Sequence, residues 1–355
     1  MIWSNGFLKI LVYNIYYMNI YILLFFVLLL SGCKQPSTEY FTKNIKVSSY
    51  KKTIQHELCG EKIIDGEIGL NNLEIIEDYL FLCLDNSDYK FKLFSIEGKN
   101  LLDFGLHGDG PNNFINTRLT GEKGIDSIGN VFVWINDVSM SKLKRVIISK
   151  TQNGLCCNTD KIVQTLPMAP NSFYVSDSLV ISEILENGKY TLQKFNPITN
   201  TIIKEIDLYK QLVKHPFNFY KGVSRYDKKS KSLILGMHSI NQVNQIEIEN
   251  EERSSCLIGK IINENDVIDP LTGLENMTYY SDLRIGDNNV YALFLNQRYN
   301  DAYEVPKPVE IHVINDGEIK KIYHINDYVL QFAVDEKNNC LYGLIGDSAV
   351  YKYNM

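Results

Sequence analysis

A unit of about 50 residues recurs six times along this chain and constrains its fold more than any other feature. Each unit begins with a two-residue turn before a short apolar run, and successive runs start 48 to 57 residues apart. A second apolar strand, a tight turn rich in Gly, Asn or Asp, and an outer strand then follow. The six apolar runs begin at Leu80, Val131, Leu179, Leu233, Val290 and Leu341.

Four strands in a repeat of this length are typical of one blade of a β-propeller. We therefore predict an all-β, six-bladed propeller built from four-stranded antiparallel blades. The sixth unit ends at Met355 after three strands, whereas strand-like residues 54–64 belong to no unit. Placing residues 54–64 as the outer strand of the last blade closes the ring and covers both sheet edges.

Two stacked β-sandwiches are the alternative fold, because they also contain many short strands. Their strands recur roughly every 8–12 residues, without a second period near 50 residues superimposed on them. The six-unit period therefore favours the propeller.

The first 32 residues have the pattern of a cleaved lipoprotein signal peptide. Residues 20–30 carry no charge. The end of this run resembles a bacterial lipobox, in which small residues permit cleavage and the Cys thiol accepts diacylglycerol. We predict that acyl chains then hold the mature protein on a membrane. The lipobox comprises Leu30, Ser31 and Gly32, and the lipidated residue is Cys33.

An uncleaved transmembrane helix is the alternative interpretation of the N-terminal segment. Residues 10–30 are long enough to span a bilayer, although Asn14 and Asn19 interrupt them. The start of translation also stays open between Met1, which gives a long leader, and Met18, which gives a very short one.

The polar residues after Cys33 have the composition of a flexible tether. We therefore divide the chain into a signal peptide (1–32), a lipidated Cys with its tether (33–53) and the propeller (54–355). Lys34 in the second mature position is similar to Gram-negative lipoproteins that are sorted to the outer membrane. That resemblance implies a location in the bacterial envelope, on the outer membrane and facing the periplasm.

The segment between the first and second units has the sequence Phe-Gly-Leu-His-Gly-Asp-Gly-Pro-Asn-Asn-Phe, from Phe104 to Phe114. It resembles the F-G-x-x-G-x-G-P-x-x-F junction of TolB-like six-bladed propeller lipoproteins of the Bacteroidetes, which have NHL-like blades. Relatives often carry Gly and Glu where this chain has Asn112 and Asn113, so no role of that acid transfers. Glycines that permit positive φ and the rigid Pro111 favour a structural crossover over an anion site.

The chain contains no G-x-S-x-G, H-E-x-x-H or G-x-G-x-x-G signature, and no two histidines have zinc-ligand spacing. We therefore assign no catalytic residue, no cofactor and no metal. Our hypothesis is a non-catalytic binding or scaffold protein for an envelope protein, peptide or glycan. The net charge of −6 argues against a nucleic-acid partner. The candidate ligand-binding residues over the channel are Asp109, Asn112, Asn113 and Arg118.

The alternative function is a propeller hydrolase or lactonase with a divalent cation in the central channel. Its conceivable ligands are Glu74, Asp126 and Asp282, which fall near predicted inner strands. By contrast, Glu183 and Glu186 have the spacing of a solvated strand face.

Six cysteines follow Cys33, an even number that permits disulfides in an oxidising compartment. Cys156 and Cys157 are adjacent, and a disulfide between them would be strained, so partners elsewhere and free thiols are both open. A buried free thiol is the simpler interpretation of Cys83, which lies in a predicted inner strand.

Overall fold

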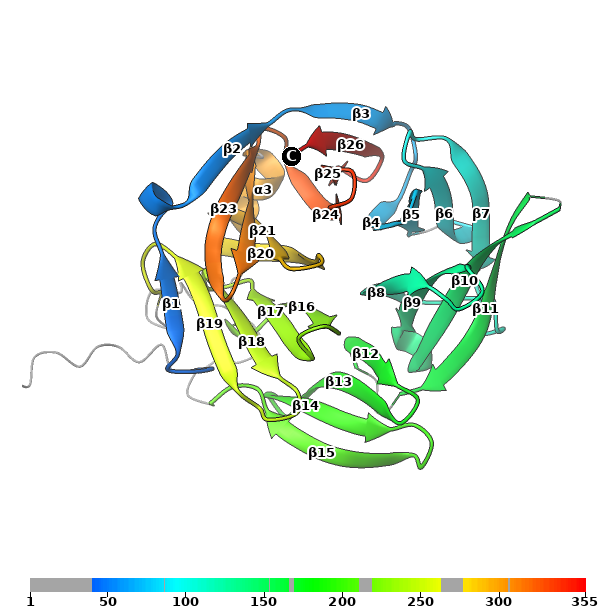
Figure 1. Cartoon of the computed structure of the whole chain (residues 1–355), viewed down its shortest axis with the longest axis horizontal. Helices are drawn as coiled ribbons and strands as arrows, with labels where there is room; N and C mark the ends of the chain where they lie inside the picture. The colour runs from blue at the N-terminus through cyan, green and yellow to red at the C-terminus, as the bar shows by residue number, and fades with distance from the viewer. Residues whose placement is uncertain are drawn as a thin grey trace, which may run out of the picture. The chain divides into compact units, whose positions relative to one another are not determined.

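The structure is a computed structural model, and it describes residues 40–85, 87–152, 154–165, 169–210, 219–262, 277–305 and 307–355. Six sheets surround a common centre, and each contains four antiparallel strands from an innermost to an outer position (Figure 1). Two of the sheets carry a fifth strand, which pairs in parallel at the outer edge. This arrangement confirms the prediction of an all-β, six-bladed propeller with four-stranded blades.

The first three blades are contiguous in the chain. Their second strands begin with apolar runs because both faces of these strands lie between neighbouring sheets. Blade 1 comprises β4 (Leu70–Ile76), β5 (Tyr79–Leu84), β6 (Tyr89–Ser95) and β7 (Asn100–Leu106); blade 2 comprises β8 (Thr117–Ile125), β9 (Val131–Asp137), β10 (Lys142–Thr151) and β11 (Gly154–Gln164); blade 3 comprises β12 (Asn171–Ser176), β13 (Leu179–Glu186), β14 (Lys189–Asn196) and β15 (Thr201–Asp207).

The last three blades each take a strand from the N-terminal region. Two short helices lie in turns between strands, η2 (Val138–Met140) in blade 2 and α3 (Tyr299–Glu304) in blade 5. Blade 4 comprises β16 (Gly222–Asp227), β17 (Ser232–Met237), β18 (Gln242–Glu247) and β19 (Arg253–Ile258); blade 5 comprises β20 (Met277–Ile285), β21 (Val290–Arg298), β22 (Val309–Asn315) and β23 (Glu318–Ile325); blade 6 comprises β24 (Val329–Asp335), β25 (Cys340–Ile345), β26 (Ala349–Asn354) and β3 (Gly60–Ile64).

An N-terminal belt, residues 45–64, runs around the outside of blades 4, 5 and 6 (Figure 1). β1 (Ile45–Ser48) pairs in parallel with β19, the 3-10 helix η1 (Tyr50–Lys52) follows, and β2 (Ile54–Leu58) pairs in parallel with β23. β3 then pairs antiparallel with β26 and completes blade 6.

The belt confirms that the N-terminal region closes the ring and corrects how it does so. We predicted residues 54–64 as a single outer strand of the last blade, but only β3 fills that position. Five residues of strand span only about 17 Å, so a chain that travels around the ring must pass from one sheet edge to the next.

Residues 40–53 are not part of a free tether, although the sequence placed them there. Tyr40 and Phe41 are buried against Tyr209 and Tyr220 between blades 3 and 4. The Tyr40 carbonyl also accepts a hydrogen bond from the Lys210 amide at 2.7 Å. Apolar burial therefore moves the start of the described propeller back from residue 54 to Tyr40.

Aromatic side chains form much of the packing between blades, as their positions in predicted strands suggested. Trp134 of blade 2 stacks on Tyr174 of blade 3 with ring centroids 4.1 Å apart. Phe91 of blade 1 meets Phe114 edge to face at 4.9 Å. The first pair joins two sheets that share no hydrogen-bonded strands, and the second joins blade 1 to the crossover segment that follows it.

The Gly-rich junction is a closed crossover, in agreement with the structural interpretation. The Phe114 amide donates to Leu106 O at 2.9 Å, and the Gly108 amide donates to Phe114 O at 3.2 Å. At Gly105, φ is +75° and an added Cβ would lie 2.6 Å from the Phe91 ring. A residue with a side chain would disturb this close packing.

All six cysteines within the described residues are free. Cys156 and Cys157 are consecutive in β11, where neighbouring side chains point to opposite faces of the sheet. Cys83 is buried, as predicted.

None of the helices in the described part of the chain has the length and hydropathy needed to cross a membrane. The signal peptide, the lipobox residues and Cys33 lie outside the described residues.

Candidate functional site

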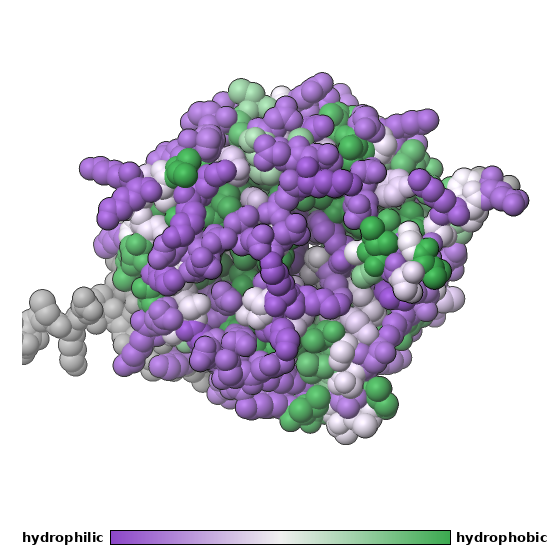
Figure 2. All heavy atoms as spheres, viewed as in Figure 1, coloured by the Kyte–Doolittle hydropathy of each residue, from purple (hydrophilic) through white to green (hydrophobic). Residues whose placement is uncertain are grey.

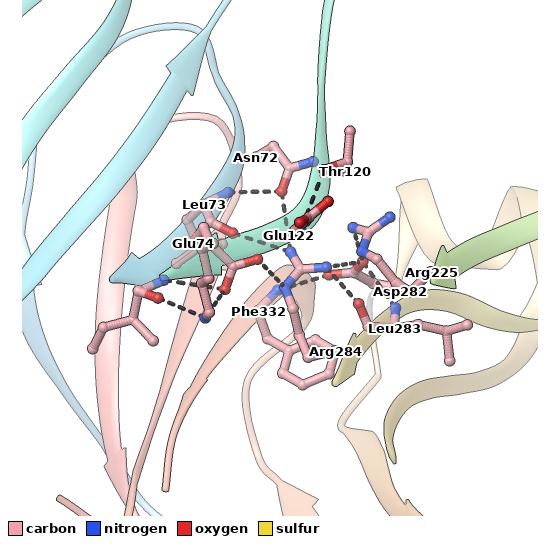
Figure 3. A network of polar contacts seen from close by, with 12 residues as sticks. Asn72, Leu73, Glu74, Thr120, Glu122, Arg225, Asp282, Leu283, Arg284 and Phe332 are labelled. Atoms are coloured by element: carbon pink, nitrogen blue, oxygen red, sulfur yellow. Dashed lines mark hydrogen bonds and ion pairs between the residues drawn. The ribbon is translucent and has the colours of Figure 1, made fainter. Parts of the chain in front are cut away.

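Charged side chains from the innermost strands meet at the centre of the ring (Figure 3). They and the backbone groups they bind come from five of the six blades, and Figure 2 shows hydrophilic side chains crowding the middle of the face in view. We call this set the central network. Its charged members are Glu74 on β4, Lys123 on β8, Arg225 on β16, and Asp282 and Arg284 on β20.

The guanidinium of Arg284 lies between two carboxylates. Its Nη1 contacts Asp282 Oδ1, and its Nε lies 3.7 Å from Glu74 Oε2. Its Nη2 donates to Asn72 Oδ1 at 3.0 Å and to Leu73 O at 3.1 Å. All three charged side chains are almost completely buried, so each depends on the others for compensation.

Glu74 has a second cationic neighbour. Lys123 Nζ lies 2.6 Å from Glu74 Oε1 and also donates to Ile75 O at 2.6 Å. Burial alone would raise the pKa of Glu74, but Lys123 and Arg284 outweigh it and lower the pKa. Glu74 is therefore ionised throughout the neutral range.

Arg225 connects the network to blade 4. Its Nη2 lies 3.3 Å from Asp282 Oδ1, and its Nη1 donates to Ser224 O at 2.9 Å. Burial and the nearby Arg284 lower the pKa of Arg225 to about 10. β8 leaves regular register beside Arg225, where Gly121 has a φ of +87°.

Glu122, next to Gly121, is the carboxyl of β8, and its pKa is raised. Burial raises its pKa to about 7, although Lys228 lies 3.2 Å away and partly opposes the shift. Its charge therefore changes near neutral pH.

The three proposed cation ligands do not form a metal site. Arg284 occupies the position between Glu74 and Asp282 that a cation would need, and its positive charge would repel one. Asp126 instead lies in the β8–β9 turn, where it accepts hydrogen bonds from the Ile128 and Asn130 amides. Within the described ranges, no three His, Cys, Asp or Glu side chains are placed to hold a metal ion.

A cavity of about 210 Å³ lies between blades 3 and 4, on the face of the ring where the innermost strands begin. We call this face the crossover face, because the chain passes there from one blade to the next, and we call the cavity the crossover cavity. Its polar and charged wall is formed by Arg118, Asn171, Glu183, Ser224 and Lys221.

Glu183 is the buried acid of the crossover cavity. It lies on β13, and only 7% of its surface is exposed. Its Oε2 accepts a hydrogen bond from Asn171 Nδ2 at 2.7 Å. Its Oε1 makes no hydrogen bond of normal geometry among the described residues, although the Ser224 hydroxyl lies near enough to favour the charged form of the carboxyl. Burial raises the pKa of Glu183. A buried acceptor without a donor costs folding free energy, and a bound ligand would offset that cost.

The rest of the cavity wall is largely apolar and aromatic. Tyr209 and Tyr220 are stacked, with ring centroids 4.0 Å apart and planes 4° from parallel, and Tyr190 meets Tyr209 edge to face at 5.9 Å. Leu185 and Leu235 complete this wall. Stacked, buried rings give it a fixed shape.

The four residues predicted to contact a ligand lie in two places. Asp109 is exposed in the crossover loop, Asn112 Oδ1 accepts a hydrogen bond from the Thr159 amide of outer strand β11 at 2.7 Å, and Asn113 O accepts one from Lys144 at 2.5 Å. Arg118, in contrast, lines the crossover cavity. Binding by these four residues stays a prediction, and only Arg118 faces a cavity that contains an unpaired buried group.

Glu183 and Arg225 were not selected from the sequence. Glu183 was interpreted with Glu186 as a solvated face, which is correct for exposed Glu186 and wrong for Glu183. The available signal was position along the strand, because Glu183 lies inside an apolar run whereas Glu186 directly precedes the turn at Asn187 and Gly188.

A second cavity of about 560 Å³ lies between blades 4 and 5, at the turns that join first to second strands. The lysine side chains in its wall already donate hydrogen bonds to protein oxygen atoms. Lys46 donates to Asp316 O at 2.7 Å, and Lys229 donates to Asp287 O at 2.9 Å and to Asn288 Oδ1 at 2.6 Å. The crossover cavity is therefore the better candidate for ligand binding.

No family model and no curated protein matches this chain. Among solved structures, it is similar to a member of the DUF4221 family from Bacteroides vulgatus ATCC 8482, with 14% identity, a TM-score of 0.53, and coverage of 84% of this chain and 97% of the other. It is also similar to a protein of Bacteroides fragilis NCTC 9343 whose name describes it as exported. The identity is 10%, the TM-score is 0.50, and the match covers 87% of this chain and 99% of the other. At these identities, the comparisons show a shared fold.

Proposed function

We propose that this protein is a lipid-anchored binding protein of the bacterial cell envelope, which holds a small ligand in the crossover cavity without converting it. The observation that carries the proposal is Glu183, a buried acid that lines an apolar-walled cavity and has one carboxylate oxygen without a hydrogen bond of normal geometry. Propellers also serve as enzymes and assembly platforms, so the proposal rests on this site and not on the fold.

The central network supports binding over catalysis. Its carboxylates are held by Arg284 and Lys123, which makes them structural links between blades. A hydrolase with a channel cation would need Glu74 and Asp282 free to bind that cation.

The membrane anchor rests on the sequence Leu30, Ser31, Gly32 and Cys33. The export in the name of the Bacteroides fragilis structure supports a location outside the cytoplasm. Because Tyr40 is already docked on the blades, at most six residues separate it from Cys33. Fully extended, this link spans about 25 Å, so the propeller would be held close to the membrane surface.

Labelling with radioactive palmitate in a bacterial host tests the anchor. The full chain is expected to incorporate label and to fractionate with membranes, and Cys33→Ala is expected to do neither. Label in the Cys33→Ala variant would contradict the proposed attachment site.

Native mass spectrometry tests the binding site. Residues 38–355 form a compact unit in which every sheet is complete, so they are suitable for purification. After incubation with the small molecules of an envelope extract, this unit is expected to retain a ligand and release it chemically unchanged. Leu185→Trp, which fills the cavity, should abolish retention, and Glu186→Gln on the same strand should not. Retention by Leu185→Trp or release of an altered ligand would contradict the proposal.

A further inference from the structure

The crossover cavity is lined by groups of opposite charge that differ in burial, with exposed cations and a buried acid. The inference drawn from this arrangement rests on the proposed function and goes further than it. Arg118 and Lys221 are exposed at the rim, and neither side chain makes an ion pair within the described residues. Glu183 is buried deeper, with one oxygen unpaired. A complementary ligand therefore has a negative group facing the rim and a hydrogen-bond donor reaching inward.

The size and the apolar wall restrict the ligand further. A volume of about 210 Å³ lies below the roughly 300–1,000 Å³ typical of sites for drug-sized ligands. Tyr190, Tyr220 and Leu185 offer an apolar surface in the same cavity. The ligand is therefore small and carries an apolar group as well as its polar groups.

We infer that the crossover cavity binds a free α-amino acid with an apolar side chain, its ammonium group on Glu183, its carboxylate at Arg118 and its side chain against the tyrosine wall. An ammonium donor suits Glu183 better than a neutral hydroxyl, since a buried carboxylate without a cation within ion-pair distance gains most from a positive charge. A monosaccharide, which would offer only hydroxyl donors and no carboxylate for the rim, fits the charges less well.

Binding of an ammonium group should also change the proton occupancy of Glu183. The charged or titratable groups that face this carboxyl are Arg118 on β8, Arg225 on β16, Tyr190 on β14 and Tyr209 after β15. Burial raises the pKa of Glu183, whereas a bound ammonium favours its charged form. Binding is therefore expected to release a proton from any protonated Glu183.

Isothermal titration calorimetry of residues 38–355 with L-leucine and L-phenylalanine tests the inference. At least one of the two is expected to bind. N-acetyl-leucine, which lacks the ammonium group, and leucinamide, which lacks the carboxylate, should each bind roughly tenfold more weakly or worse. Glucose serves as the hydroxyl-only probe and should not compete.

Matched variants test which residues contact the ligand. Glu183→Gln should weaken leucine binding roughly tenfold or more and remove proton release, which is measured as the dependence of the binding enthalpy on the buffer. Arg118→Ala should weaken binding of leucine but not of leucinamide. Glu186→Gln, an exposed change on the same strand, should leave all values unchanged.

Three outcomes would overturn the inference. Equal affinity for leucine and N-acetyl-leucine would show that Glu183 does not bind an ammonium group, and unchanged affinity in Glu183→Gln would place the amino acid elsewhere. Binding of glucose, or of another extract component, at this cavity in place of both amino acids would overturn the ligand class while leaving the proposed binding function intact.

Discussion

The side chain of Arg225 on β16 crosses directly over Gly121 on β8, so closely that a Cβ at position 121 would lie 2.8 Å from Arg225 Cδ. The two strands belong to blades 4 and 2, which are not neighbours in the ring. This contact shows how far the central network reaches across the channel, and it can be tested directly.

Gly121→Ala is expected to destabilise the propeller by about 2–4 kcal/mol, through strain at positive φ and through collision with Arg225. Gly129→Ala is a matched control, because Gly129 has a φ of +88° with no atom within 4 Å of the added Cβ. Backbone strain alone should lower the unfolding free energy of the Gly129→Ala variant by about 1 kcal/mol. Urea unfolding measures both values, and equal losses would mean that the Arg225 contact has no energetic importance.

Asp282→Asn is expected to lower the free energy of unfolding by about 3–5 kcal/mol. The change leaves the buried guanidinium groups of Arg284 and Arg225 without the full negative charge that balances them. The control is Glu249→Gln, which breaks a surface pair with Lys231 in which both side chains are more than half exposed. Solvent screens that pair, so little change is expected. The structural role assigned to the network would be wrong if the two variants unfolded at the same denaturant concentration.

Glu183→Gln is expected to stabilise the ligand-free protein at neutral pH. Because burial raises the pKa of Glu183, the folded state binds its proton more tightly than the unfolded state does. Stability of the wild type therefore falls as pH rises above the ordinary carboxyl pKa, and the loss is complete above the folded pKa. The stability difference between variant and wild type should grow with pH from about 4 upward. Thermal melting across this range measures it, and a difference that does not depend on pH would contradict the assignment.

Phe41→Ala tests where the ordered propeller begins. Phe41 is 2% exposed and its ring packs near Tyr209 and below the Arg253 guanidinium, so its truncation should cost about 3 kcal/mol. Val47→Ala, a change in exposed β1, should have little effect. If Phe41→Ala and Val47→Ala had the same melting temperature, residues 40–53 would be the free tether that composition alone predicts.

The number and order of the blades followed from local information. Each unit of about 50 residues contains its own turns and alternating strands, and each closes most of its hydrogen bonds within itself. Strand pairing of this kind depends on neighbouring residues, which is why Val131 and Leu341 marked their blades correctly. The route of the N-terminal belt was harder to predict, because β1 and β2 pair with β19 and β23, about 200 or more residues away.

By itself, the sequence determined the all-β repeat architecture, closure by the N-terminal region and the structural nature of the Gly-rich junction, because turn chemistry and strand alternation act over short distances. Only the tertiary structure decided which charges meet at the centre and which acid is buried. Arg284 reaches Glu74 from more than 200 positions along the chain. Glu183 lies in the middle of β13, where neighbouring sheets cover both faces, whereas Glu186 lies at the exposed end of the strand. Burial and ion pairing at the channel are properties of the closed ring, so no single repeat contains them.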